Sequence, residues 1–449
     1  MSAASSPTKA SAEFAANPLL IGRGLPPFSE IKPEHIVPGI ERLLKTLEQD
    51  LQALEMQLES QLETTLQSPP KSPPESSPSW SELVEPLTNI TERLGWSWGV
   101  ISHLMGVKNS PELRSAYESV QPALVQFANR ISQSQVIYDA LKRLRKGDRW
   151  AGLDSAQQRI VEAALRDAEL SGVGLTGEAK VKFNDTQQSL AELSNQFSNH
   201  VLDATKAFSL TLTQKDDVAG LPPSLLSLTA QSAREAGANE ATPESGPWRI
   251  TLDMPCYTPF LRHAERRDLR EKLYRAFITR ASSGEWDNTP LIEQILALRS
   301  HQAALLGFEN YAELSLARKM ASSVSAVETL MEELRAASYE AAKRELEAIE
   351  KFAHHSDIKQ WDLPYWTERM RESEFDLNDE ALRPYFPLPR VLEGLFGLAE
   401  RLFGISISAA DGQAPTWHPD VRYFQVSDAD SGDRLAHFYL DPYSRPAEK

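Results

Sequence analysis

Apolar residues recur at three- and four-residue steps through most of this 449-residue chain, with charged residues between them. Because that spacing places apolar side chains along one face of an α-helix, the sequence predicts a mainly α protein. The clearest helix is expected to begin with Thr289 as its N-cap and Pro290 at its first position, and to end at Gly307. Its apolar stripe is Leu291, Ile295, Leu298 and Leu305.

The same spacing predicts three further helices. Ser110 and Pro111 mark the start of one of them. A helix close to thirty residues long is expected beyond the Ser-rich segment 322–325, and its stripe is Val327, Leu330, Leu334, Ala341 and Ile349. A late helix is expected to end at Gly404, with a core face made of Leu392, Phe396, Ala399 and Phe403.

Strands are few, and they predict a small sheet within the helical body. The candidates are residues 208–213, 248–253, 421–426 and 435–440. The last two are expected to form a hairpin, because the segment between them is rich in Asp, Ser and Gly. The chain ends nine residues beyond this hairpin, which leaves a sheet edge without a cover in the sequence, so we expect a truncated protein.

The net charge and the cysteine content indicate which partners and which cell compartment to expect. The formal net charge of -16 would repel a phosphate backbone, so no nucleic-acid partner is expected. The densest basic run, residues 142–146, is predicted to stabilise the C-terminal end of a helix. Cys256 is the single cysteine, which excludes an intrachain disulfide and favours a reducing compartment, the cytoplasm. No apolar run has the length of a membrane span.

The expected organisation is a flexible tail and two large regions. Residues 1–16 are Ser/Ala-rich and form the tail, residues 17–205 an N-terminal helical domain, and residues 206–449 a helical domain with the small sheet. Residues 67–79 are rich in Pro and Ser and are expected to form a solvated linker. A PxxP ligand for a partner's aromatic groove is the alternative for that segment.

Two short patterns resemble known sites, but their context argues against both. Gly172, Gly174 and Gly177 match G-x-G-x-x-G, yet a helix is predicted before them where a dinucleotide site needs a strand, so a helix-to-helix turn is expected. His263 and Glu265 spell H-x-E, but the two cysteines that a zinc deaminase places after this pattern are missing.

The histidines provide no metal site by their spacing. His354 and His355 are adjacent near the end of a long predicted helix, where their side chains point about 100° apart and cannot readily share one ion. No pair of histidines has the i, i+4 spacing, and H-E-x-x-H, G-x-S-x-G and P-loop motifs are absent from the sequence. The residues alone therefore predict no catalytic and no metal-ligating position, and leave the substrate-binding residues unknown.

An ordered series of segments resembles oligopeptidase A and the thimet oligopeptidase-like zinc endopeptidases. The resemblance covers about residues 17–445 apart from the Pro-rich insertion. The segments are 17–20 (NPLL), 25–28, 31–38, 80–87 (WSELVEPL), 103–104, 111–114, 197–205, 361–366 (WDLPYW), 382–388, 391–396, 401–405 and 438–441.

This resemblance implies a large, two-lobed, neurolysin-like helical body with a small sheet and a deep channel that cuts short peptides with one zinc. In the family the zinc is held by two His of H-E-x-x-H and a more distant Glu, and the motif's Glu acts as general base. None of these residues can be carried over to this sequence, which resembles only the N-terminal part and lacks the C-terminal catalytic zincin helices. We expect zinc in the complete family enzyme and none bound by this chain alone.

The resemblance therefore predicts the N-terminal part of an intracellular zinc-dependent oligopeptidase that is inactive by itself. The alternatives are a non-catalytic peptide-binding or scaffold remnant, and one half of a split peptidase whose partner is a separate C-terminal catalytic half. Tyr365, Trp366, Tyr385 and Phe386 could line the channel, but ordinary core packing is the preferred expectation for this aromatic cluster.

Overall fold

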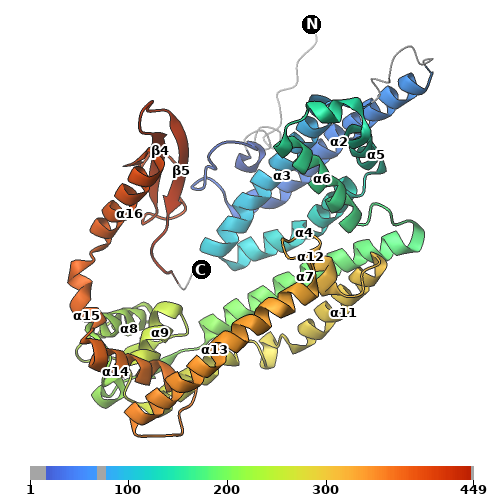
Figure 1. Cartoon of the computed structure of the whole chain (residues 1–449). Coiled ribbons are helices and arrows are strands. Elements are labelled where there is room, and N and C mark those ends of the chain that lie inside the picture. Colours follow the sequence, from blue (N-terminus) through green and yellow to red (C-terminus); the bar gives the residue numbers. More distant parts are fainter. Residues whose placement is uncertain (1–16, 68–76, 446–449) are drawn as a thin grey trace.

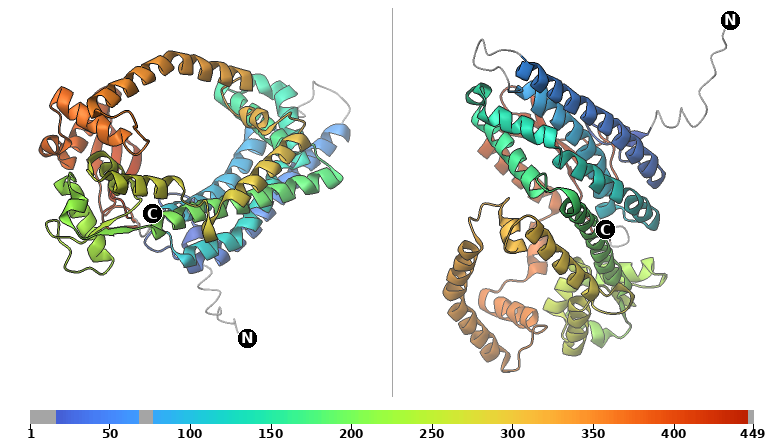
Figure 2. Two further views of the ribbon diagram at one scale, coloured as in Figure 1. Left: turned by 90° about the horizontal axis from the view of Figure 1, so that it is seen from below. Right: turned by 90° about the vertical axis from the view of Figure 1, so that its right-hand side faces the viewer.

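The computed structural model describes residues 17–67 and 77–445, and its helices form two groups joined by long helices (Figure 1). The predicted tail, and residues 68–76 of the predicted linker, lie outside the described residues. The N-terminal helices gather on one side of the molecule and α8, α9 and α14 on the other, and α7 and α13 run between them (Figures 1 and 2). The expected mainly helical fold class with small antiparallel sheets is confirmed.

The N-terminal group is a set of packed helices with a Leu-rich core. Ser79 caps α3 together with Glu82 in a capping box, and Ser110 caps α4 as the sequence predicts. Leu47, Leu51 and Leu144 are among the side chains fully buried between the helices. The long elements are α2 (Ile36–Gln67), α3 (Trp80–Val107), α4 (Pro111–Ser132), α5 (Gln135–Lys146), α6 (Ser155–Leu170) and α7 (Gly177–Ala207).

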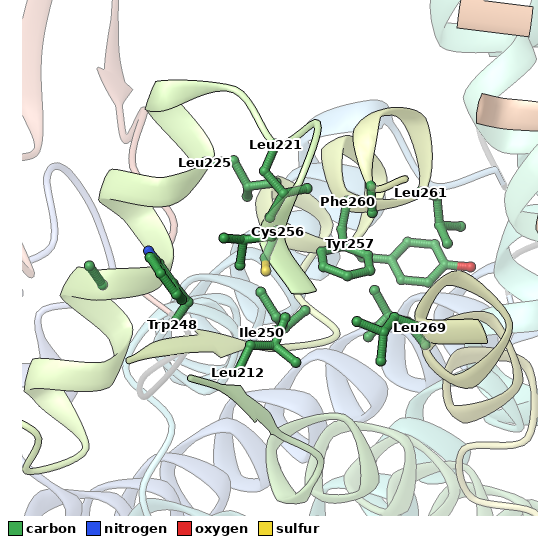
Figure 3. Packing of buried hydrophobic residues seen from close by; sticks show 14 of the residues in the cluster. Leu212, Leu221, Leu225, Trp248, Ile250, Cys256, Tyr257, Phe260, Leu261 and Leu269 are labelled. Atoms are coloured by element: carbon green, nitrogen blue, oxygen red, sulfur yellow. The ribbon is translucent and has the colours of Figure 1, made fainter. Parts of the chain in front are cut away.

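The second group surrounds a two-stranded antiparallel sheet, β1 (Leu210–Leu212) with β2 (Trp248–Ile250). Three helices pack around it: α8 (Pro223–Glu235), α9 (Met254–His263) and α10 (Arg267–Ile278). Figure 3 shows how Cys256 and Phe260 of α9 meet the strands and α8 in this core. The two strands are shorter than the sequence predicts, but both are present where expected.

The remaining helices lead from α11 and α12 beside α7, across the molecule along α13, to α14, α15 and α16 on the left of Figure 1. They are α11 (Thr289–Leu305), α12 (Tyr311–Leu316), α13 (Val324–Ala353), α14 (Leu363–Phe375), α15 (Asp379–Leu382) and α16 (Leu388–Phe403). Helix α11 packs against α7, and α13 contacts α12 near one end and α14 near the other. The 30 residues of α13 confirm the expected length, and Gly404 ends α16 in the left-handed conformation.

A three-stranded antiparallel sheet of order β3-β4-β5 follows α16. Its strands are β3 (Ile405–Ala409), β4 (Arg422–Asp428) and β5 (Arg434–Leu440), so the predicted hairpin is confirmed and β3 is an additional strand. Phe396 of α16 packs against Phe424 and Phe438. The ring of Trp417 contacts His103 and Phe28, which joins this C-terminal sheet to the N-terminal helices.

Three local expectations were wrong. Asn288, not Thr289, is the N-cap of α11, so the helix begins one residue earlier than predicted. Phe403, expected on a core face, is 73% exposed, and on α13 only Ile349 of the predicted stripe is buried. Apolar periodicity was correct in both helices, but it did not distinguish the covered members of each stripe from the exposed ones. Among the described helices, none is long and apolar enough to cross a bilayer.

Candidate functional site

The segment 361–366 anchors the junction of α10 and α14 through one buried carboxylate. Asp362, the residue before α14, accepts hydrogen bonds from Arg267 (Nη2 to Oδ2, 2.8 Å) and from Arg270 (Nη2 to Oδ1, 2.9 Å). The backbone N–H of Lys359 donates to the same carboxylate. Burial raises the pKa of Asp362, but the hydrogen bonds from the two arginines outweigh this effect and lower it. The junction is therefore rigidly positioned.

One turn into α14, three possible metal ligands meet. His263, the last residue of α9, lies beside Glu368 and Glu372, and one ligand atom of each lies within 4.8 Å of the others. The two glutamates share a helix face because they are four residues apart. The structure thus places His263 near α14 and does not pair it with Glu265 in the H-x-E pattern that the sequence drew attention to.

Two arginines already pair with these three side chains. Arg371 Nη2 donates to Glu368 Oε1 over 2.5 Å, and Arg369 Nε lies 3.2 Å from Glu372 Oε2. Arg369 Nη2 lies 3.1 Å from His263 Nδ1, and since a guanidinium can only donate, this ring nitrogen is the acceptor. Burial lowers the pKa of His263, which favours the neutral ring.

This donor set does not fit a catalytic zinc. Each carboxylate has a guanidinium partner and the imidazole accepts from Arg369, so a cation would have to displace arginine from ligands that it already neutralises. Zinc catalysis also needs an open coordination position for water. The cluster of His263, Glu368 and Glu372 is therefore an ion-pair network that joins α9 to α14.

A polar recess of about 450 Å³ lies between α2, α4, α5 and α7. Glu55 accepts from Arg130 (Nη1 to Oε1, 2.8 Å) and from Ser134. Burial raises the pKa of Glu55, and the hydrogen bonds from Arg130 and Ser134 outweigh it and lower the pKa. Gln133 donates to Asn184 Oδ1 over 2.7 Å. These groups satisfy one another and join the helices, whereas Gln188 Oε1 in the same lining is buried without a hydrogen-bond partner among the described residues.

A second recess of about 480 Å³ brings two of the family-like segments together. Arg114, from segment 111–114, donates to both carboxylate oxygens of Asp203, from segment 197–205, over 2.6 and 2.7 Å. Asn109 Oδ1 accepts from Arg114 Nε over 2.7 Å. A bidentate arginine–carboxylate pair fixes orientation as well as distance, so it sets how α4 lies on α7.

The structure separates the predicted aromatic cluster. Tyr365 lies under the guanidinium of Arg270, 4.2 Å from the ring centroid, and its ring contacts Trp366. Tyr385 and Phe386 are 77% and 64% exposed, so the expectation of core packing is wrong for these two residues.

The other patterns noted in the sequence have structural roles. Gly172, Gly174 and Gly177 connect α6 to α7, which confirms the helix-to-helix turn. His354 is the C-cap of α13 in the left-handed conformation, and both it and His355 are exposed. Arg143, Arg145 and Lys146 of the basic run 142–146 lie in the last turn of α5, as predicted. No described residue outside the His263 cluster forms a three-donor His, Cys, Asp or Glu group.

Comparison with protein families gives two matches. Residues 40–180 match the family model described as "Neurolysin/Thimet oligopeptidase, N-terminal domain", and residues 260–449 match "Peptidase family M3".

Comparison with curated proteins gives long alignments to oligopeptidases. The chain is 47% identical over 442 residues to "Organellar oligopeptidase A, chloroplastic/mitochondrial" of Arabidopsis thaliana, covering 97% of the chain and 53% of that relative. It is also 47% identical to "Probable cytosolic oligopeptidase A" of the same plant, covering 97% and 60%. It is 37% identical to "Oligopeptidase A" of Escherichia coli, covering 96% and 61%. The chain thus spans between 53% and 61% of the length of these three relatives.

Proposed function

The chain belongs to the oligopeptidase A and thimet oligopeptidase-like family, and from this premise we propose that it is the helical N-terminal part of an M3 metallopeptidase that hydrolyses short peptides. The observation that carries this proposal is the 47% identity to an oligopeptidase A over 97% of the chain. The two family models match residues 40–180 and 260–449, which supports the proposed division near residues 205 and 206.

We propose that the catalytic zinc ligands come from an M3 segment outside this sequence. Zinc peptidases need two imidazoles and a carboxylate with an open position for water, and the sequence contains no H-E-x-x-H. In the described part of the chain, the one His/Glu/Glu group is committed to Arg369 and Arg371. The contribution of this chain would then be to hold and orient the catalytic segment and to limit which peptides reach it.

The proposed compartment is the cytoplasm. A single, buried cysteine and a cytosolic relative at 47% identity support it. An organellar relative is equally similar, so localisation of the tagged protein in its own cell is the deciding measurement.

The test of the proposed function compares two proteins. The first is the 449-residue chain, and the second is a chimera in which that chain continues into the part of the Arabidopsis cytosolic relative that it does not cover. We expect zinc-dependent, chelator-sensitive cleavage of a fluorogenic short peptide by the chimera and none by the 449-residue chain. Robust zinc-dependent turnover by the 449-residue chain itself would overturn the proposal.

A second candidate function, a non-catalytic half that assembles with a separate M3 chain, is favoured by the exposed apolar faces of α13 and α16. It differs from the first candidate only in that the M3 segment belongs to a separate chain. Co-purification of a separate M3 chain with this one from its own cell would favour it.

A further inference from the structure

The apolar side chains of α16 divide between two faces. Phe396 points at the sheet and packs against Phe424 and Phe438. A second row lies at steps of three and four residues, and its members are 41% to 66% exposed. We name this row the α16 stripe: Leu388, Val391, Leu395, Leu398 and Leu402. Alternating steps of three and four form the seam by which one helix packs against another.

Helix α13 has a similar uncovered stretch. Every residue from 328 to 340 is exposed, including Leu330, Met331 and Leu334, which follow one another along one side. Helices in proteins gain most of their stability from packing of an apolar face, so thirteen consecutive exposed residues are unusual for a helix with an apolar row.

The C-terminal sheet also has an uncovered edge. In the order β3-β4-β5, β5 pairs on one side only within the described part of the chain. Leu435 at its start is exposed. An edge strand presents unpaired backbone N–H and C=O groups, to which another strand can add.

These uncovered features lie in one stretch of the chain, between residues 328 and 440. In Figure 1, α13 crosses the molecule to α14, and α15, α16 and the C-terminal sheet follow along the left side. Between residues 315 and 409 the buried apolar side chains are Ile349 and Trp361. By contrast, α2 alone contributes Ile36, Ile40 and several leucines to closed cores.

We propose that the M3 segment that this sequence does not contain covers the α16 stripe, residues 328–340 of α13 and the β5 edge, which together are its docking face. Two observations select this occupant. All three elements lie within residues 260–449, the part that matches the M3 family model. The relatives that match 96–97% of the chain are longer than it, so each has further chain available to cover such a face. The inference rests on the proposed function, because it names the partner of that same assembly.

The test uses the chimera and the 449-residue chain side by side, and it does not require the added segment to fold alone. Hydrogen–deuterium exchange of residues 328–340 and of α16 should be about tenfold slower or more in the chimera. The double substitution Leu395→Glu/Leu402→Glu should lower the thermal midpoint of the chimera and leave that of the 449-residue chain unchanged. Ile160→Glu on α6, also an exposed apolar residue of a helix, is the control and should change neither.

The outcomes separate the inference from the proposed function. Unchanged exchange at α13 and α16, or equal effects of the double substitution on both proteins, would overturn the docking face whatever the peptidase activity. Slower exchange in a chimera that cleaves no peptide would support the docking face and overturn the proposed function. Self-association of the 449-residue chain that the double substitution abolishes, with no added protection in the chimera, would assign the face to a second copy and overturn the inference.

Discussion

Arg270 and Asp362 are 92 positions apart in the sequence and form an ion pair inside the protein. Nη2 of Arg270 lies 2.9 Å from Oδ1 of Asp362, and the two side chains are 3% and 1% exposed. Arg270 also donates to the backbone carbonyls of Ala264 and Trp361. One guanidinium thus connects the end of α9, the body of α10 and the start of α14, which is the segment that also places Glu368 and Glu372.

Replacing Asp362 should destabilise the protein strongly. Asp362→Ala leaves the buried Arg270 without its carboxylate, and breaking such a pair from one side costs about 3–5 kcal/mol. Urea unfolding followed by circular dichroism measures the loss. Asp357→Ala is the control, because Asp357 pairs with Lys359 in the exposed part of the same loop and should cost less than about 1 kcal/mol. Equal losses would contradict the role assigned to Asp362.

The same carboxylate should make stability depend on pH. The pKa of Asp362 in the folded protein is lower than its ordinary value of 3.8. The carboxylate therefore contributes its full share of the unfolding free energy above pH 3.8, and this share is lost as the pH falls through the folded pKa. Asp362→Asn removes the charge with little change in shape. The difference in unfolding free energy between wild type and Asp362→Asn should therefore stay constant down to about pH 5 and shrink below it. A difference that also stays constant below about pH 5 would show that the charge is not what stabilises the junction.

Zinc should not stabilise the 449-residue chain, because the side chains of His263, Glu368 and Glu372 that could bind it already pair with arginines. We expect the unfolding free energy to change by less than about 0.5 kcal/mol in excess zinc. Arg369→Ala removes the partner of His263 and Glu372, and the freed donors should then bind zinc. At a hundredfold excess over its dissociation constant the metal would add about 2.7 kcal/mol. Stabilisation of the wild type, or none in the variant, would contradict this reading of the cluster.

Helix boundaries could be predicted because they depend on adjacent residues. Ser110 and Pro111 start α4, and Gly404 ends α16, as their local chemistry requires. The start of α11 was placed one residue late because both Asn288 and Thr289 are residue types that cap helices. Strand β3 was missed since it follows Gly404 directly and is only five residues long.

Features that depend on distant residues could not be predicted. The spacing of apolar residues on α16 is the same whether or not a partner covers Phe403, so periodicity alone could not tell a core face from an exposed one. His263 and Glu368 are separated by more than a hundred residues, and only the i, i+4 spacing of the two glutamates gave any local indication of their cluster.

Trp417 should be the residue that secures the C-terminal sheet to the N-terminal helices. Its ring contacts His103 at a centroid distance of 4.2 Å and Phe28 at 5.0 Å, and its Nε1 donates to Asp441 Oδ2 over 3.0 Å. Trp417→Ala removes a large buried side chain and should cost about 3–5 kcal/mol. Tyr385→Ala is the control, since its exposed ring should contribute less than about 0.5 kcal/mol.

The regions in which hydrogen exchange accelerates distinguish loss of the Trp417 contacts from unfolding of the whole protein. In Trp417→Ala, hydrogen exchange should accelerate in β4 and β5 while the core of α8, α9 and β2 keeps its protection, because that core shares no residue with the Trp417 cluster. Uniform acceleration across the described chain would show instead that Trp417 stabilises the protein as a whole and not the attachment of the sheet.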